Sequence, residues 1–243
     1  MRARTTLAQT FLLVYNTWMY RKTPFVEGEH YHIYSRGVEK RKVFMNARDY
    51  DRFIALLYIM NQDAPFRMDN FLRDKKLKNI FVEEKSKALV SILSYCLMPN
   101  HFHLILYECK DGGITKFMGK LFTAYSMYFN AKYERSGPLF THPFRSEHID
   151  NESQYMYIFS YLHLNPLSVI YKKWKEEGIK DKKEAEEFLK SYKFSSYLDF
   201  LEKHRPESVI IDFSFIPDRI KNMEVNLKTY DNTFRANNAL EFE

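Results

Sequence analysis

The sequence is poor in the residues that build covalent or metal cross-links. Its 243 residues include only two cysteines, Cys96 and Cys109, too few for a disulfide framework or a cysteine-rich zinc site. No apolar run reaches the roughly 20 residues of a membrane span, and we find no internal repeat or low-complexity linker. The low cysteine content fits a reducing compartment and predicts a cytoplasmic protein.

Aromatic residues and positive charge are abundant instead. Phe, Tyr and Trp make up 17% of the chain, and 37 Lys and Arg against 31 Asp and Glu leave a formal net charge of +6. Cations bind phosphates and aromatic rings stack on unpaired bases, so this composition is compatible with a nucleic-acid ligand. An ordinary basic protein can have the same composition, so the two interpretations stay open.

The pattern of apolar residues predicts an α+β domain over residues 24–167. Alternation predicts strands over 29–37, 89–97, 101–108 and 139–149, and helical periodicity predicts helices over 46–61, 114–137 and 151–165. Along the chain the predicted order is strand, helix, strand, strand, helix, strand, helix. This order is that of the ferredoxin-like split βαβ arrangement, an antiparallel sheet with helices on one face. Asn46 and Asp150 are the expected caps of the first and last of these helices.

Two terminal regions flank the predicted domain. We expect residues 1–23 to be an N-terminal extension, with Met19 as an alternative start. Residues 168–243 are predicted to form a basic, mainly helical C-terminal appendage, in which we find no chemical motif.

The stretch "LMPNHFHLIL", residues 97–106, carries two histidines in one strand pattern. Side chains alternate along a strand, so His101 and His103 share one face, while Phe102, Leu104 and Leu106 share the other. We expect the apolar face beneath the helices and the two imidazoles on the open face, about 6–7 Å apart at Cα. They can converge on one cation, or they can be two surface histidines. The spacing alone does not decide.

A tyrosine and an asparagine are also suitably spaced near the end of the last predicted helix. Tyr161 and Asn165 are four residues apart, so both project from one helical face before Pro166. A phenol can act as a nucleophile and an amide oxygen as a ligand, although a tyrosine in this position is more often a core aromatic. Other tyrosines and a histidine of the same helix compete with Tyr161 by composition: Tyr155, Tyr157 and His163.

Four segments, in chain order, resemble the single-tyrosine HUH transposases, and among them the REP-associated tyrosine transposases: "YHIYSRG", "SYCLMPNHFHLIL", "YFNAKYERSGPLF" and "YIFSYLHLNPL". The resemblance covers about residues 24–167. It implies that Tyr161 is the nucleophile and that His101, His103 and Asn165 bind a divalent cation. Mixed nitrogen and oxygen ligands suit Mg²⁺ or Mn²⁺.

The resemblance also implies an activity and a partner. The chain would be a metal-dependent endonuclease and strand transferase that cuts single-stranded DNA through a 5′-phosphotyrosine intermediate and rejoins it at hairpin-associated sites. Its partners would be single-stranded and hairpin DNA, with no membrane, and a homodimer is compatible with it. The predicted DNA contacts are Arg36, Lys40, Arg41, Lys42, Lys116, Lys120 and Arg145. A solvated charged loop explains the cluster after the first strand equally well.

Two other functions are weighed against this one. A non-catalytic nucleic-acid-binding regulator on the same fold would not need Tyr161, His101, His103 and Asn165, and all four are present. A zinc hydrolase would need a nearby carboxylate base or further His or Cys ligands, which the motif lacks.

Overall fold

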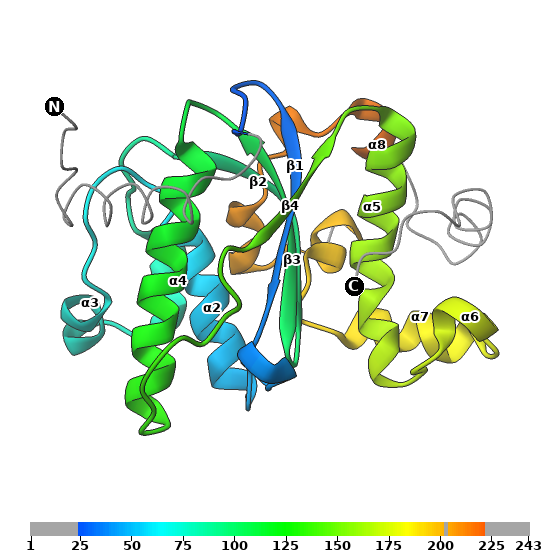
Figure 1. The fold of residues 1–243 in the computed structure, drawn as a ribbon, viewed down its shortest axis with the longest axis horizontal. Coiled ribbons are helices and arrows are strands. Elements are labelled where there is room, and N and C mark those ends of the chain that lie inside the picture. Colours follow the sequence, from blue (N-terminus) through cyan, green and yellow to red (C-terminus); the bar gives the residue numbers. More distant parts are fainter. Residues whose placement is uncertain (1–23, 202–203, 222–243) are drawn as a thin grey trace, which may run out of the picture.

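A four-stranded antiparallel sheet forms the centre of the protein (Figure 1). The computed structural model describes residues 24–201 and 204–221, so the predicted extension 1–23 lies outside the described residues. The sheet has the order β2-β3-β1-β4. Its strands are β1 (His30–Arg36), β2 (Val90–Met98), β3 (His101–Glu108) and β4 (Arg145–Ile149). The predicted α+β class and the β-α-β-β-α-β order are confirmed.

One face of the sheet packs against two helices, α2 (Ala47–Ile59) and α4 (Gly113–Lys132), which lie on the same side in Figure 1. Phe102 of β3 lies between them. Its ring centroid is 5.1 Å from that of Phe53 on α2 and 5.9 Å from that of Phe122 on α4. This is the apolar core that the alternation of β3 predicts.

The other face is covered by α5 (Glu152–Leu164), followed by η3 (Asn165–Val169). The sequence pattern predicts that this face is open, and the structure differs in this detail. The reason lies in α5 itself, where Tyr157, Ile158 and Phe159 are consecutive and all buried. A helix that is apolar around its circumference is stable only when it is covered on both sides. Two histidines on this face of the sheet, His32 and His103, are therefore buried.

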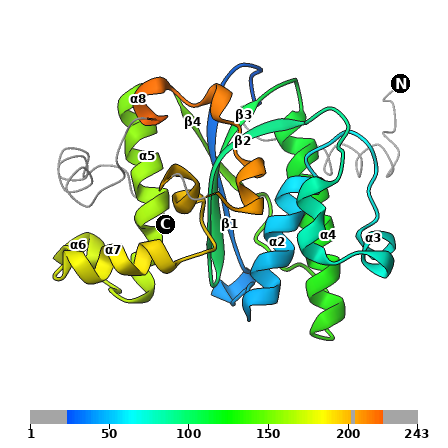
Figure 2. The same ribbon diagram turned by 180° about the vertical axis from the view of Figure 1, so that it is seen from behind.

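The C-terminal region consists of short helical segments. They are α6 (Trp174–Glu177), α7 (Lys182–Ser191), η4 (Ser196–Leu201), η5 (Pro206–Ile210), η6 (Phe213–Phe215) and α8 (Asp218–Lys221). Gly178 follows α6 with φ of 76°, in the left-handed region, which stops that helix. The segment then runs along the β2 edge (Figure 2), where the N–H of Leu97 donates to the Phe194 carbonyl at 2.9 Å.

The connections hold three further short elements, η1 (Val38–Lys40), α3 (Met68–Asp74) and η2 (Leu77–Val82). The strand predicted to begin at residue 139 begins at Arg145, and Phe140 forms only an isolated bridge with Gly37. The cap of α5 is Asn151, whose side chain accepts the Gln154 N–H at 2.8 Å, and not the predicted Asp150. Within 24–201 and 204–221, no helix is long and apolar enough to cross a membrane.

Candidate active site

The register of the sheet gathers polar side chains on the face beneath α5. The central strand β1 sets the pairing: Tyr34 is opposite both His103 and Arg145, and His32 is opposite Glu147. Residues directly opposite on neighbouring strands point to the same face. This face therefore carries side chains from three strands: His32 and Tyr34, His101 and His103, Arg145 and Glu147.

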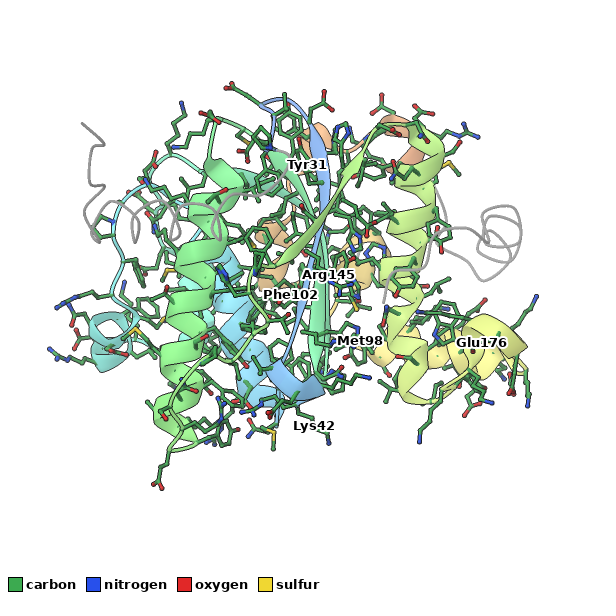
Figure 3. All side chains as sticks on the ribbon, viewed as in Figure 1. Tyr31, Lys42, Met98, Phe102, Arg145 and Glu176 are labelled. Atoms are coloured by element: carbon green, nitrogen blue, oxygen red, sulfur yellow. The ribbon has the colours of Figure 1, made fainter. Side chains whose placement is uncertain are left out.

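A cavity of about 470 Å³ lies against this face. It is lined by the four residues that the resemblance selects, His101, His103, Tyr161 and Asn165. Four cations also line it: Arg36, Arg145, Lys172 and Lys175. In Figure 3, Arg145 lies on the sheet and Glu176 on α6, and both residues line the cavity. The structure thus places the predicted nucleophile, the predicted ligands and a positive rim around one space.

His101 and His103 are neighbours with perpendicular rings, and their centroids are 5.0 Å apart. Burial lowers the pKa of His101 to about 4, a shift that the hydrogen bond to Asn165 opposes and the positive charge of Lys175 adds to. Burial also holds the pKa of His103 well below its usual range, and the charge of Lys175 acts in the same direction. Both rings are therefore neutral near pH 7 and can present a lone pair.

The His103 ring has one satisfied nitrogen and one unsatisfied nitrogen. Its Nδ1 is 2.9 Å from Nε2 of His32, whereas its buried Nε2 has no hydrogen-bond partner among the described residues. A buried polar atom without a partner costs free energy, so the atom fits a ligand that the chain alone does not supply. The Nδ1 of His101 donates to Oδ1 of Asn100 at 2.7 Å. In both rings, a proton on Nδ1 leaves the Nε2 lone pair for a cation.

The donor set that fits such a cation is two imidazole nitrogens and one amide oxygen. Across 24–201 and 204–221, no three His, Cys, Asp or Glu side chains cluster in a metal-binding arrangement. The Asn165 side chain, which is 3% exposed and hydrogen-bonded to His101, can supply an amide oxygen as a third donor. Nitrogen and oxygen donors together suit Mg²⁺ or Mn²⁺ rather than a metal that prefers thiolates.

A row of polar side chains supports His103 from behind: His32 is hydrogen-bonded to His103, and the Glu147 carboxylate lies next to His32. His32 is completely buried, and its Nδ1 is 3.8 Å from Oε2 of Glu147. The hydroxyl of Tyr34 donates to the other carboxylate oxygen of Glu147 at 2.9 Å. Burial, followed by the charge of Glu147, raises the pKa of Tyr34 to about 12, so this tyrosine stays protonated. Partners of this kind orient a ligand imidazole and fix its tautomer.

Sequence reasoning missed His32 and Glu147. A signal was present, because His30-Tyr31-His32 in β1 is a second pair of histidines with the same spacing as that in β3. Its meaning depends on the register of β1 against β3 and β4, which fixes which imidazole faces His103.

Tyr161 and Asn165 both come from the end of α5. The Tyr161 side chain is 3% exposed, and its ring is perpendicular to the His103 ring at a centroid distance of 5.6 Å. The Tyr161 hydroxyl lies 3.1 Å from Nζ of Lys175, which donates to it. The Asn165 N–H donates to the Tyr161 carbonyl, and Pro166 follows in η3. The helix thus holds both side chains on consecutive turns of one face.

The competing residues of α5 lie elsewhere. Tyr155 packs edge-on against His30, with centroids 5.4 Å apart. His163 is completely buried, its Nε2 is 2.8 Å from Oγ of Ser196, and burial lowers its pKa to about 3. Tyr157 stacks on Tyr161 at 6.4 Å. Among the residues that the structure describes, the cavity lining includes none of these three.

The predicted DNA contacts fall into separate groups. Arg36 and Arg145 line the cavity. The loop after β1 carries Lys40, Arg41 and Lys42. Of these, Lys40 and Lys42 are exposed, and Arg41 forms an ion pair with Glu39 at 2.7 Å.

The last two predicted contacts, Lys116 and Lys120, are on α4, across the sheet from α5. Lys116 forms an ion pair with Asp63 at 2.8 Å, and Lys120 donates to the Ala64 carbonyl at 2.9 Å. The structure does not bring these two lysines to the cavity.

Comparisons with known proteins give a family match over more than half of the chain. A family profile described as "Transposase IS200 like" matches residues 26–165. A similar solved structure is described as that of a REP-associated tyrosine transposase bound to a REP hairpin. It has a TM-score of 0.42 and 14% sequence identity, over 80% of this chain and 94% of that chain. A search of curated proteins finds no match. The profile match contains His101, His103 and Tyr161 and ends at Asn165.

Proposed function

Because the chain belongs to the family of IS200-like transposases, we propose that it cuts and rejoins single-stranded DNA through a covalent tyrosine intermediate. The observation that carries this proposal is the convergence of Tyr161, His101, His103 and Asn165 on one cavity with a positive rim. A nucleophile beside neutral imidazoles that can bind a cation is an arrangement suited to attack on a phosphodiester.

The metal centre of this proposal consists of His101, His103 and Asn165, which would hold Mg²⁺ or Mn²⁺. Such a cation, when bound, offsets negative charge that develops on the scissile phosphate. The chain prepares the site in two ways: burial keeps both imidazoles neutral, and His32 with Glu147 holds the His103 ring in one orientation. The unsatisfied Nε2 of His103 supports this assignment.

The reaction follows from the position of Tyr161. Its oxygen attacks the phosphorus, a new P–O bond forms, and the bond from phosphorus to the 3′ oxygen breaks. The phenol loses its proton and the departing 3′ oxygen gains one, which leaves a 5′-phosphotyrosine and a free 3′-hydroxyl. A 3′-hydroxyl of another DNA end then attacks the phosphotyrosine, and Tyr161 departs. The bond count is conserved, so rejoining needs no ATP.

The cations around the cavity supply the contacts to DNA. Arg36 and Arg145 lie on the same sheet face as the histidines, so their charges can bind phosphates next to the scissile one. The exposed loop cations Lys40 and Lys42 extend this positive surface beyond the end of β1. By resemblance, the substrate is a hairpin with an adjacent single strand. DNA contacts of Lys116 and Lys120, across the sheet, stay a prediction.

The test is a covalent adduct assay with a hairpin oligonucleotide that carries a single-stranded flank. We expect wild-type protein and Mn²⁺ to give a protein–DNA band that survives denaturation. Tyr161→Phe should abolish the band and leave DNA binding intact, because only the phenolic oxygen is lost. Tyr157→Phe is the matched control, since it removes the hydroxyl of the tyrosine that stacks on Tyr161 outside the cavity.

Three outcomes contradict parts of the proposal. An adduct on the Tyr161→Phe variant means that another residue is the nucleophile. An adduct that persists in the presence of a chelator removes the metal role. Wild-type protein that binds the DNA tightly and gives no adduct with either cation is the behaviour of a non-catalytic regulator.

A further inference from the structure

A lysine from outside the family-matched span contacts the proposed nucleophile. Lys175 lies on α6, ten positions beyond the last matched residue, Asn165. Its Nζ is 3.1 Å from the Tyr161 hydroxyl and 4.7 Å from the centroid of the same ring. The cation thus approaches both the oxygen and the face of the phenol, and the family motifs do not account for it.

The fold holds this lysine in place through its neighbours. Trp174, the first residue of α6, is 2% exposed and therefore anchors the short helix in the protein. The chain between α5 and α6 is compact, because the N–H of Tyr171 donates to the Leu167 carbonyl at 2.7 Å and that of Trp174 to the Tyr171 carbonyl at 3.2 Å. Lys175 is half-buried and lines the cavity. Its ammonium position is therefore determined by packed elements.

We propose that Lys175 is a catalytic residue, whose ammonium group stabilises negative charge on the Tyr161 oxygen during attack and during departure. The inference rests on the proposed function. As the bond between phosphorus and the tyrosine oxygen forms, the bond to the 3′ oxygen breaks, and Lys175 keeps all of its protons throughout. In the rejoining step, the same oxygen leaves with negative charge. The ammonium group of Lys175 therefore accelerates both adduct formation and rejoining, since the two steps pass through the same kind of transition state.

This role gives a function to the C-terminal region. Residues 168–201 would complete the active site, although they lie beyond the segment that the family profile covers. The other role open to a lysine in a positive cavity is to bind a DNA phosphate. The two roles differ in what they change: a phosphate contact changes DNA affinity, whereas a contact with the nucleophile changes the rate of the bound complex.

The experiment compares three variants of the full chain. Lys175→Met keeps the length of the side chain and removes its charge, and Lys175→Arg keeps the charge. Lys180→Gln is the matched control, because it removes the charge of an exposed lysine of the same region outside the active-site cavity. For each variant we would measure three quantities: the single-turnover rate of adduct formation at saturating DNA, the rate at which isolated adduct is rejoined, and the Kd for the oligonucleotide.

We expect Lys175→Met to slow adduct formation and rejoining by similar factors, roughly 100-fold, which is typical when one donor to a developing charge is removed. The Kd should change little, Lys175→Arg should recover most of the rate, and Lys180→Gln should behave as wild type. Thermal unfolding of each variant checks that it is folded. If Lys175→Met fails to fold, Lys175→Gln takes its place as the uncharged variant.

Each contrary result has a distinct meaning. Wild-type protein without any adduct overturns the proposed function. Wild-type adduct together with an unchanged rate in a folded, uncharged variant overturns the role of Lys175 alone. A weaker Kd with an unchanged rate at saturating DNA assigns Lys175 to phosphate binding and likewise overturns the inference.

Discussion

Both faces of β3 carry fully buried residues, but the two faces are built from different chemistry. Phe102 and Leu104, on the α2 and α4 side, are 0% exposed, and His103, on the α5 side, is 2% exposed. A buried hydrocarbon needs no partner, whereas each buried ring nitrogen does. His32 satisfies one nitrogen of His103, and the other has no partner in the described part of the chain. The apolar face supplies stability, and the polar face keeps an atom available for a ligand.

The largest difference between substitutions on the two faces of β3 should be in the free energy of unfolding. Phe102→Ala removes a fully buried ring that contacts Phe53, Phe122 and Phe140, so we expect a loss of about 3–5 kcal/mol in the free energy of unfolding. Urea denaturation with an unchanged m-value would measure this loss. His103→Ala, the matched change on the other face, should cost clearly less stability and abolish cation binding. Equal losses from both variants would contradict the division between the faces.

A smaller effect should appear in cation affinity when the support of His103 is weakened. Glu147→Gln removes the negative charge next to His32, the residue that is hydrogen-bonded to His103. We therefore expect Mn²⁺ affinity to fall roughly 10-fold or more. Titration calorimetry with Mn²⁺ measures the change without any DNA. Glu29→Gln is the control, because Glu29 pairs at 2.9 Å with His148, an exposed histidine outside the cavity. Equal affinities in the two variants would show that the carboxylate does not support the ligand.

The smallest effect should be the response to mild acid. An ordinary histidine is about nine-tenths protonated near pH 5.5. His101, with its pKa lowered to about 4, stays neutral there, and so does His103. We therefore expect Mn²⁺ affinity to change by less than about twofold between roughly pH 7 and pH 5.5. A tenfold loss over this interval would mean that the rings titrate as exposed histidines do.

The same lowered pKa values set the sign of the effect on folding. Below about pH 6.5 the unfolded chain takes up protons on these imidazoles before the folded chain does. The free energy of unfolding should therefore decline as the pH falls from about 6.5 toward 4, the pKa of His101. Cation-free protein should show this decline in its melting temperature.

Much of the fold follows from local patterns. Alternation in β3 predicted its observed bounds and the separation of Phe102 from the two histidines, because a strand places neighbours on opposite faces. Pro166 marked the end of α5. The position of α5 could not be predicted in the same way, since a helix that is apolar all round has no stripe to indicate which sheet face it covers. The cap fell on Asn151 instead of Asp150 because adjacent residues of the same capping type differ only in local geometry.

The candidate site was predictable in part. His101, His103, Tyr161 and Asn165 occur in recognisable motifs, and they line one cavity. The supporting residues needed the register of β1, which places His32 opposite Glu147. The contact of Lys175 with Tyr161 could not be predicted from the sequence, because it depends on how α6 packs after α5. No local pattern in a lysine-rich stretch distinguishes one lysine from its neighbours.

The spacing of Tyr161 and Asn165 on α5 has a consequence for tolerance to change. An α-helix turns about 100° per residue, so one residue inserted between them would rotate Asn165 about a quarter-turn away from His101 while Tyr161 stayed in place. A substitution inside this interval can be absorbed by repacking, but a change in its length cannot. The number of residues between Tyr161 and Asn165 thus sets their relative orientation. We expect this number to be less tolerant of change than the identity of the residues between them.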